Sequence, residues 1–149
     1  MWVFDVNTLT WQWISGSDKI GATGVYGEQG THDEANVPGA RKGAVGWFDA
    51  AANEIWLFGG STTSGSITLY YNDLWNFKVD DGQWAWISGS DTADQHGVYG
   101  TKGSPVSTNV PGARHYAAGW FDSTAKHLWL FGGTGYSSSL GPGACACLN

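Results

Sequence analysis

The strongest constraint on this chain is an internal repeat that covers nearly all of it. Residues 11–18, Trp-Gln-Trp-Ile-Ser-Gly-Ser-Asp, return 73 residues later as residues 84–91, Trp-Ala-Trp-Ile-Ser-Gly-Ser-Asp. The same offset relates residues 36–41 to 109–114, and it holds without a gap across residues 2–60. A fixed period of this length is the signature of a repeat architecture. The 149 residues are therefore one structural unit written about twice.

The composition indicates that this unit is built from strands. Ten Trp and 23 Gly beside only 13% charged residues fit tightly turned strands with large aromatic side chains better than amphipathic helices. The net charge of −6 argues against nucleic acid, whose phosphates need clustered Lys and Arg. No stretch approaches the ~20 apolar residues of a membrane helix. We expect neither a nucleic-acid partner nor membrane insertion.

Each period is predicted to contain four short antiparallel strands, because turn residues separate four apolar runs. Bulky side chains alternate in the third and fourth runs, so one face of the sheet must be buried against a neighbour. A polar stretch rich in Gly and Ser, residues 61–70, is expected to be a loop between the second and third strands. In the complete period the four strands are residues 44–49, 54–58, 72–77 and 84–87.

Several short motifs follow one another in a fixed order within the period. A Gly-Gly doublet closes the second strand in both copies, at Gly59-Gly60 and Gly132-Gly133. A polar loop follows, then Asn-Asp-Leu-Trp at residues 72–75, then a spaced Trp pair in the fourth strand. This order resembles the kelch family of β-propellers, whose ordinary period is about 50 residues. The longer period resembles the long-repeat variety of large, often extracellular proteins and of galactose oxidase-like central domains. WD40 repeats fit less well, because the Trp-Asp and Gly-His signatures are missing.

The resemblance implies an all-β fold of kelch-type blades, each of four antiparallel strands, with about two blades in the chain. Propellers typically use four to eight blades, so such a ring closes only by oligomerisation or with further sequence. Three or four copies would give six or eight blades. The expected partner is therefore another copy, in a trimer or tetramer, unless the chain is part of a longer propeller. The single kelch region, residues 1–149, divides into a half blade at 1–14, a full blade at 41–87 and a half blade at 114–149.

The long links should all emerge on one face, because the strands alternate in direction. These links are residues 15–41, 61–71, 88–114 and 134–149. Binding residues usually lie on such loops, so a protein or glycan ligand is expected there. The candidate ligand-binding residues are Tyr26, Arg41, Tyr70, Tyr71, His96, Tyr99, Arg114, His115, Tyr116 and Tyr136.

Residues that are identical in both copies are better explained as staples, meaning residues whose side chains fix a loop in place, than as ligand contacts. Tyr26 and Tyr99 form one such pair, and Arg41 and Arg114 form another. Ligand specificity would then be determined by positions that differ between the two copies, such as residues 42–43 and their counterparts 115–116.

Catalytic signals are weak, so no catalytic residue, metal or cofactor is predicted. The four His show no metal-ligand spacing, and no Gly-x-Ser-x-Gly elbow is present. The leading hypothesis is a non-catalytic binding module. The alternative is a structural, self-assembling repeat protein. A galactose oxidase-like enzyme is a remote alternative, because none of that enzyme's copper-ligand motifs can be carried over.

Two features near the ends of the sequence leave alternatives open. Cys145 and Cys147 are separated by one residue, and a bridge between them would be strained. Three alternatives remain open for these cysteines: they could be free thiols, they could contact another chain, or they could bind a metal. The first residues lack the basic segment and apolar core of a secretory signal. An extracellular location is implied only by the family resemblance.

Overall fold

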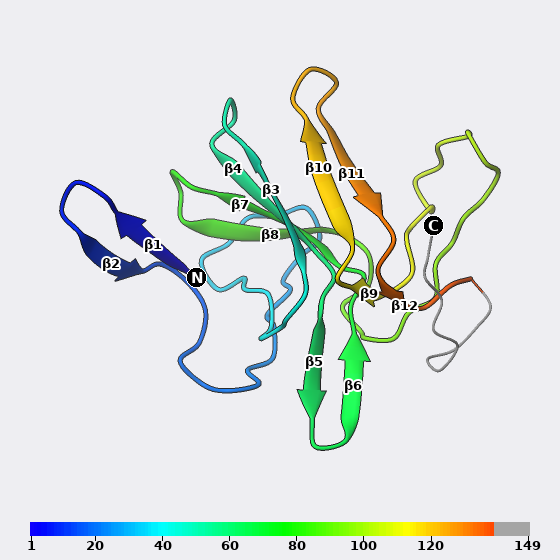
Figure 1. Ribbon diagram of the computed structural model, residues 1–149, viewed down its shortest axis with the longest axis horizontal. Coiled ribbons are helices and arrows are strands. Elements are labelled where there is room, and N and C mark those ends of the chain that lie inside the picture. Colours follow the sequence, from blue (N-terminus) through cyan, green and yellow to red (C-terminus); the bar gives the residue numbers. More distant parts are fainter. Residues whose placement is uncertain (139–149) are drawn as a thin grey trace.

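The structure, a computed structural model, describes residues 1–138 and is all-β there (Figure 1). Twelve strands form five small antiparallel sheets in this range. The described part contains no helix long and apolar enough to cross a membrane. Cys145, Cys147 and the last part of the expected C-terminal half blade lie outside the described residues.

The central sheet contains the four strands predicted from the sequence. They are hydrogen-bonded in chain order, and every neighbouring pair is antiparallel. The turn into the last strand has Gly82 at φ 68°, as expected of the Asp-Gly pair in a tight turn. Each observed boundary lies within two residues of its prediction. The strands are β3 (Val45–Asp49), β4 (Glu54–Phe58), β7 (Leu74–Lys78) and β8 (Gln83–Ser88).

Two further hairpins repeat parts of this sheet in the same register. In the hairpin of β1 (Trp2–Asp5) and β2 (Thr10–Trp13), Phe4 lies opposite Trp11, as Phe77 lies opposite Trp84 in β7 and β8. The second hairpin joins β10 (Ala118–Asp122) to β11 (His127–Phe131), and it reproduces the pairing of β3 with β4. The 73-residue repeat of the sequence is therefore also a repeat of strand register.

The stretch expected to be a loop at residues 61–70 is instead a hairpin. β5 (Ser61–Ser64) pairs with β6 (Ile67–Tyr70), and the hairpin projects away from the turns of the central sheet (Figure 1). Threonines in both strands favour the extended backbone, although the composition is polar. A second short pair, β9 (Arg114–His115) with β12 (Thr134–Gly135), lies beside it.

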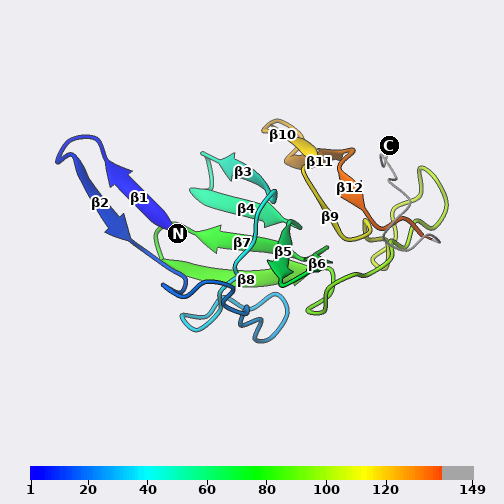
Figure 2. The same cartoon turned by 60° about the horizontal axis from the view of Figure 1, so that its bottom comes forward.

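The core consists of two aromatic clusters that join neighbouring sheets. In one, Trp47 and Phe58 pack against Phe121 and Leu128 of the β10–β11 hairpin. In the other, Trp75, Phe77 and Trp84 pack against residues that include Met1 and Ile14. Figure 2 shows the β1–β2 hairpin, the central sheet and the β10–β11 hairpin following one another across the molecule.

The close approach of two of these sheets requires a glycine. Gly119 of β10 lies against Val45 and Trp47 of β3, and a Cβ atom on Gly119 would come within 2.7 Å of Trp47 Nε1. Lys126 adds a polar link, because its Nζ lies 2.9 and 2.8 Å from the two carboxylate oxygens of Asp49. The central sheet and the β10–β11 hairpin are therefore held in one fixed arrangement.

The aromatic residues at the two ends of this row lack the cover that their repeat counterparts have. Trp2 is 61% exposed and Trp11 66%, whereas the corresponding Trp75 and Trp84 are 0% and 5% exposed. At the other end Phe131 is 55% exposed, against 5% for its counterpart Phe58. Within the described residues, each end sheet therefore presents the surface that is buried in the central sheet.

Candidate functional site

Five of the ten predicted site residues form one cluster of aromatic rings on the side of the β5–β6 hairpin. We call Tyr70, His96, His115, Tyr116 and Tyr136 the aromatic cluster. Its ring centroids are 4.4 Å apart for His115 and Tyr116, 5.0 Å for Tyr70 and His115, 6.0 Å for Tyr70 and Tyr136, and 5.3 Å for His96 and Tyr136. Three of these four contacts are edge-to-face, a favoured geometry for aromatic pairs.

Backbone hydrogen bonds between the two repeats position the cluster. The amide of Tyr116 donates to the carbonyl of Gly43 at 2.7 Å, and the amide of Arg114 donates to that of Tyr71 at 2.9 Å. Asp94 fixes the link before β9, because its carboxylate accepts from the Tyr70 amide while its own amide donates to the Tyr70 carbonyl. The cluster thus lies at the junction of the repeats, where segments distant in sequence meet.

Two residues of the cluster, His115 and Tyr136, have pKa values shifted in favour of their neutral forms. His115 Nδ1 lies 2.9 Å from the hydroxyl of the buried Ser61. Burial lowers the pKa of His115, and the nearby Lys42 lowers it further. Burial also raises the pKa of Tyr136, and the Asp94 carboxylate adds to that shift. The cluster therefore offers ring faces and neutral hydrogen-bonding groups.

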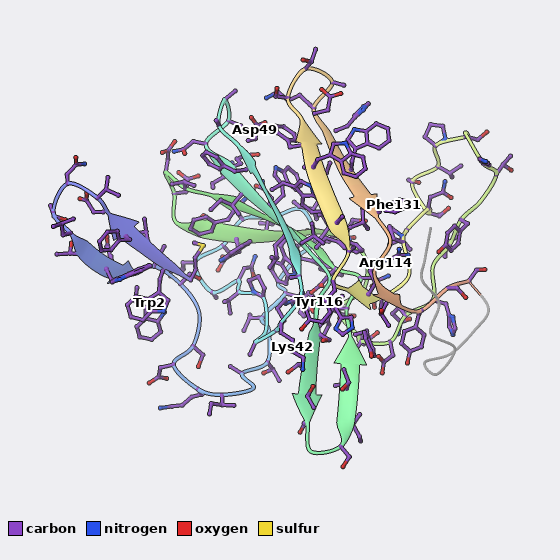
Figure 3. All side chains as sticks on the ribbon, viewed as in Figure 1. Trp2, Lys42, Asp49, Arg114, Tyr116 and Phe131 are labelled. Atoms are coloured by element: carbon purple, nitrogen blue, oxygen red, sulfur yellow. The ribbon has the colours of Figure 1, made fainter. Side chains whose placement is uncertain are left out.

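Tyr116 is an exposed ring of the cluster and is held in an unusual backbone conformation. It is 66% exposed and has φ 54°, the left-handed region that bulky residues rarely adopt. Its repeat counterpart is Gly43, with φ 65°. A Cβ on Gly43 would lie 2.9 Å from the Tyr116 ring, so the missing side chain makes room for it. Tyr116 lies near Lys42, at the base of the β5–β6 hairpin (Figure 3). Strained backbone that the surroundings maintain is typical of functional positions.

Tyr26, Arg41 and Tyr71 lie instead in a staple around a buried carboxylate. Arg41 binds Asp73 through two nitrogens, at 2.6 and 2.8 Å, and stacks on the Tyr71 ring at 4.6 Å. The Tyr26 hydroxyl and the Trp75 indole each donate to Asp73 at 2.8 Å. Burial, with a smaller effect of Asp73, raises the pKa of Tyr26, so its phenol remains a donor. This network fastens the link at residues 15–41 to the start of β7.

The sequence analysis missed Asp73, which is the centre of this staple. Its side chain is fully buried, and its two oxygens accept four hydrogen bonds from three side chains. The available signal was its place in the Asn-Asp-Leu-Trp motif at residues 72–75.

Tyr99 and Arg114, the counterparts of Tyr26 and Arg41, take no part in the aromatic cluster's ring contacts. Arg114 donates to the carbonyls of Gly112 and Gly132, both at 3.0 Å, and is 6% exposed. No carboxylate among residues 1–138 forms an ion pair with it. Tyr99 is 49% exposed. The second repeat therefore has the cation and the tyrosine of the staple, but the described residues supply no acid.

A hydroxyl–imidazole pair lies at the aromatic cluster. Ser61 and His115 form a hydroxyl–imidazole pair, but Ser61 is fully buried, so its oxygen is not accessible to a substrate. A search of residues 1–138 finds no group of three His, Cys, Asp or Glu side chains that could hold a metal ion. The exposed part of the cluster consists of aromatic rings.

Comparison with known proteins adds no family assignment, because no family model and no curated protein matches this chain.

Proposed function

We propose that this chain is a non-catalytic binding module of the kelch-propeller type, which recognises a protein or glycan through its long-loop face. The observation that carries the proposal is the aromatic cluster. Five residues, selected from the sequence as ligand candidates, are in continuous ring contact that includes the exposed Tyr116.

The chemistry of the cluster favours an uncharged ligand with both apolar and hydroxyl surfaces. Tyrosine rings offer a large rigid contact area and a polar hydroxyl at low entropic cost. His115 is kept neutral by burial. A glycan has the matching combination of C–H faces and hydroxyl groups. We therefore infer a glycan as the first ligand class to test and a protein as the second.

The proposed scaffold is a propeller with residues 41–87 as a full blade and residues 1–14 and 114–149 as half blades. The antiparallel order β3-β4-β7-β8 and the repeated register of the two hairpins support this division. In such a ring the long links of all blades would share one face. The aromatic cluster, which lies between two repeats, would then recur around that face.

The decisive experiment is a glycan array, with a pull-down of protein ligands in parallel, on the wild-type chain and the Tyr116→Gly variant. The variant puts the first repeat's residue at a position whose backbone already suits glycine, so the fold should be retained. We expect loss of binding in this variant. Val6→Ala, which removes an exposed side chain in the turn between β1 and β2 and outside the long links, is the matched control and should bind normally. Blank arrays and pull-downs for the wild type, or normal binding by Tyr116→Gly, would overturn the proposal.

The second candidate function, a structural self-assembling protein, is favoured by the exposed aromatic ends. Trp2 and Phe131, at opposite ends of the row of sheets, are both more than half exposed (Figure 3). Large exposed apolar surfaces typically mark interaction sites. Native mass spectrometry tests this directly: a discrete trimer or tetramer is expected from closure into six or eight blades. A monomer at micromolar concentration would exclude closure by copies.

A further inference from the structure

We propose that Arg114, Tyr99 and the outer edge of β11 form a docking site for a β-strand that is headed by an aspartate. In this site the aspartate carboxylate binds the Arg114 guanidinium, and the strand that follows pairs antiparallel with β11. The inference rests on the internal repeat and does not depend on what the loop face binds.

The first repeat contains a filled version of this site. Arg41 donates through Nε to the Gly39 carbonyl and through Nη1 to the Gly59 carbonyl, at 3.1 and 2.9 Å. Arg114 makes the same two bonds one period later, to Gly112 and Gly132, both at 3.0 Å. Both guanidinium groups are therefore held by equivalent carbonyls. In the first repeat, Nη1 and Nη2 also donate to the Asp73 carboxylate.

The second guanidinium is buried, and no acid among the described residues pairs with it. Only 6% of Arg114 is exposed, and it forms no ion pair within residues 1–138. The sequence of residues 139–149 contains neither Asp nor Glu. Carbonyl oxygens satisfy two of its donors but do not neutralise its charge, and an uncompensated buried charge is costly. A carboxylate is the ligand that relieves this cost and matches the fork geometry of an arginine.

A pocket of about 290 Å³ lies beside this guanidinium, lined by residues that include Tyr99, Pro111, Arg114 and Leu130. The counterparts of two of these residues hold the head of β7 in the first repeat. Tyr26 donates to Asp73 and packs against Trp75 with a centroid distance of 4.9 Å, and Leu57 lies opposite Trp75 in the sheet. The pocket is therefore placed to receive an Asp and the Trp two residues after it.

The edge of β11 supplies the backbone partner for the same strand. β4 pairs with β3 on one side and β7 on the other, whereas β11 pairs only with β10 among the described strands. In the first repeat, Leu57 of β4 lies opposite Trp75 and Ile55 lies opposite Phe77. A strand docked on β11 in the same register would place its Trp opposite Leu130 and its Phe opposite Leu128. The docked strand would cover Phe131, which is 55% exposed. The occupant is thus a strand of the pattern Asp-x-Trp-x-Phe, as at residues 73–77.

The test is binding of a synthetic hairpin, residues 71–88 of this chain, to the full-length protein. A fluorescent label at the N-terminus and the same solubilising tag at the C-terminus of every peptide allow titration by fluorescence anisotropy. We expect saturable binding of the wild-type peptide. Its Asp73→Asn form should bind at least about tenfold more weakly, because one partner of a desolvated charge pair has been neutralised.

The decisive change is made in the peptide, so it does not depend on the folding of a protein variant. On the protein side, Arg114→Met should abolish the difference between the two peptides. Lys102→Met, which removes an exposed positive charge elsewhere in the same link, should preserve it. Equal binding of both peptides to the wild-type chain would overturn the carboxylate site, and no binding of either would overturn the docking site altogether.

A second copy of this chain is the other occupant that the test can reveal. Its β1 strand has the counterpart register but carries no counterpart of Asp73, so it would pair with β11 without filling the carboxylate site. The hairpin peptide brings that carboxylate, so an oligomer closed through β11 should dissociate as the peptide binds. An oligomer that remains intact while the peptide fails to bind would overturn the proposal.

Discussion

Arg41 and Asp73 form a two-point ion pair in which both side chains are almost completely removed from solvent. Their two N–O distances are 2.6 and 2.8 Å, with side-chain exposures of 6% and 0%. Because Arg41 precedes β3 and Asp73 precedes β7, the pair joins two strands of the central sheet to the link at residues 15–41. This pair gives the long link a fixed geometry.

Substitution of this pair should be strongly destabilising. Asp73→Asn leaves a buried guanidinium without its counter-charge, and we expect a loss of about 3–5 kcal/mol in the free energy of unfolding. Urea denaturation measures the loss. The matched control is the exposed pair of Lys19 and Asp18, where Lys19→Ala should cost at most about 1 kcal/mol. Similar losses for the two variants would contradict a structural role for the staple.

Tyr116 and Gly43 should show energetic coupling. Gly43→Ala adds a Cβ that collides with the Tyr116 ring and also strains a left-handed backbone, so it should destabilise the wild-type chain. In the Tyr116→Gly background the collision with the ring is absent, while the backbone strain and a contact of 3.2 Å with His115 Cβ remain. A double-mutant cycle by thermal unfolding should therefore give an interaction energy of about 0.5–3 kcal/mol. Strict additivity would show that the ring does not rest on Gly43.

Acidification should weaken the fold partly through His115. Its pKa in the folded chain is below the ordinary value of 6.5, because burial and then Lys42 disfavour the imidazolium. The unfolded chain therefore binds this proton first, and stability falls as the pH drops below about 6.5. The loss is complete once the pH is below the folded-state pKa. His115→Gln should have a flatter profile of unfolding midpoint between pH 7 and 5. An unchanged slope would exclude this origin.

The link between Lys126 and Asp49 should contribute to stability at neutral pH but not in strong acid. Lys126 is the main cause of the lowered pKa of Asp49, with amide hydrogen bonds contributing. A lowered carboxyl pKa stabilises the fold above the ordinary value of 3.8, and this contribution is lost as the pH falls through the folded-state pKa. Lys126→Met should therefore lower the unfolding midpoint at pH 7. The difference from wild type should shrink toward pH 3, and a difference independent of pH would contradict the assignment.

The repeat made the strands of the central sheet predictable, because the alternation of large and small side chains along each strand could be compared with that in a second copy. The same reasoning failed at residues 61–70, where a polar composition was interpreted as a loop. There the hydrogen bonds of β5 and β6 stabilise a hairpin that buries little apolar surface, which hydrophobic periodicity cannot detect.

Five of the ten candidate residues lie together in the structure, but the sequence did not predict how they are arranged. Tyr70, His115 and Tyr136 were placed on one face by strand direction alone. Their ring contacts depend on how Asp94 folds the link at residues 89–113 back onto Tyr70, which no local pattern encodes. Asp73 was missed because the residues expected to fix the loops were chosen from those identical in both copies, and this acid has no acidic counterpart one period later.

The tryptophans differ widely in solvent exposure, so the intrinsic fluorescence of the protein can report on binding. Trp75 and Trp84 lie in the core, whereas Trp2, Trp11 and Trp129 lie on the outer sheets in contact with solvent. Indole emission and its quenching by acrylamide therefore contain two populations that differ in access to the quencher. Any molecule that covers an outer sheet will shift the accessible population toward the protected one. Association at the ends of this chain can thus be followed in solution without an attached dye.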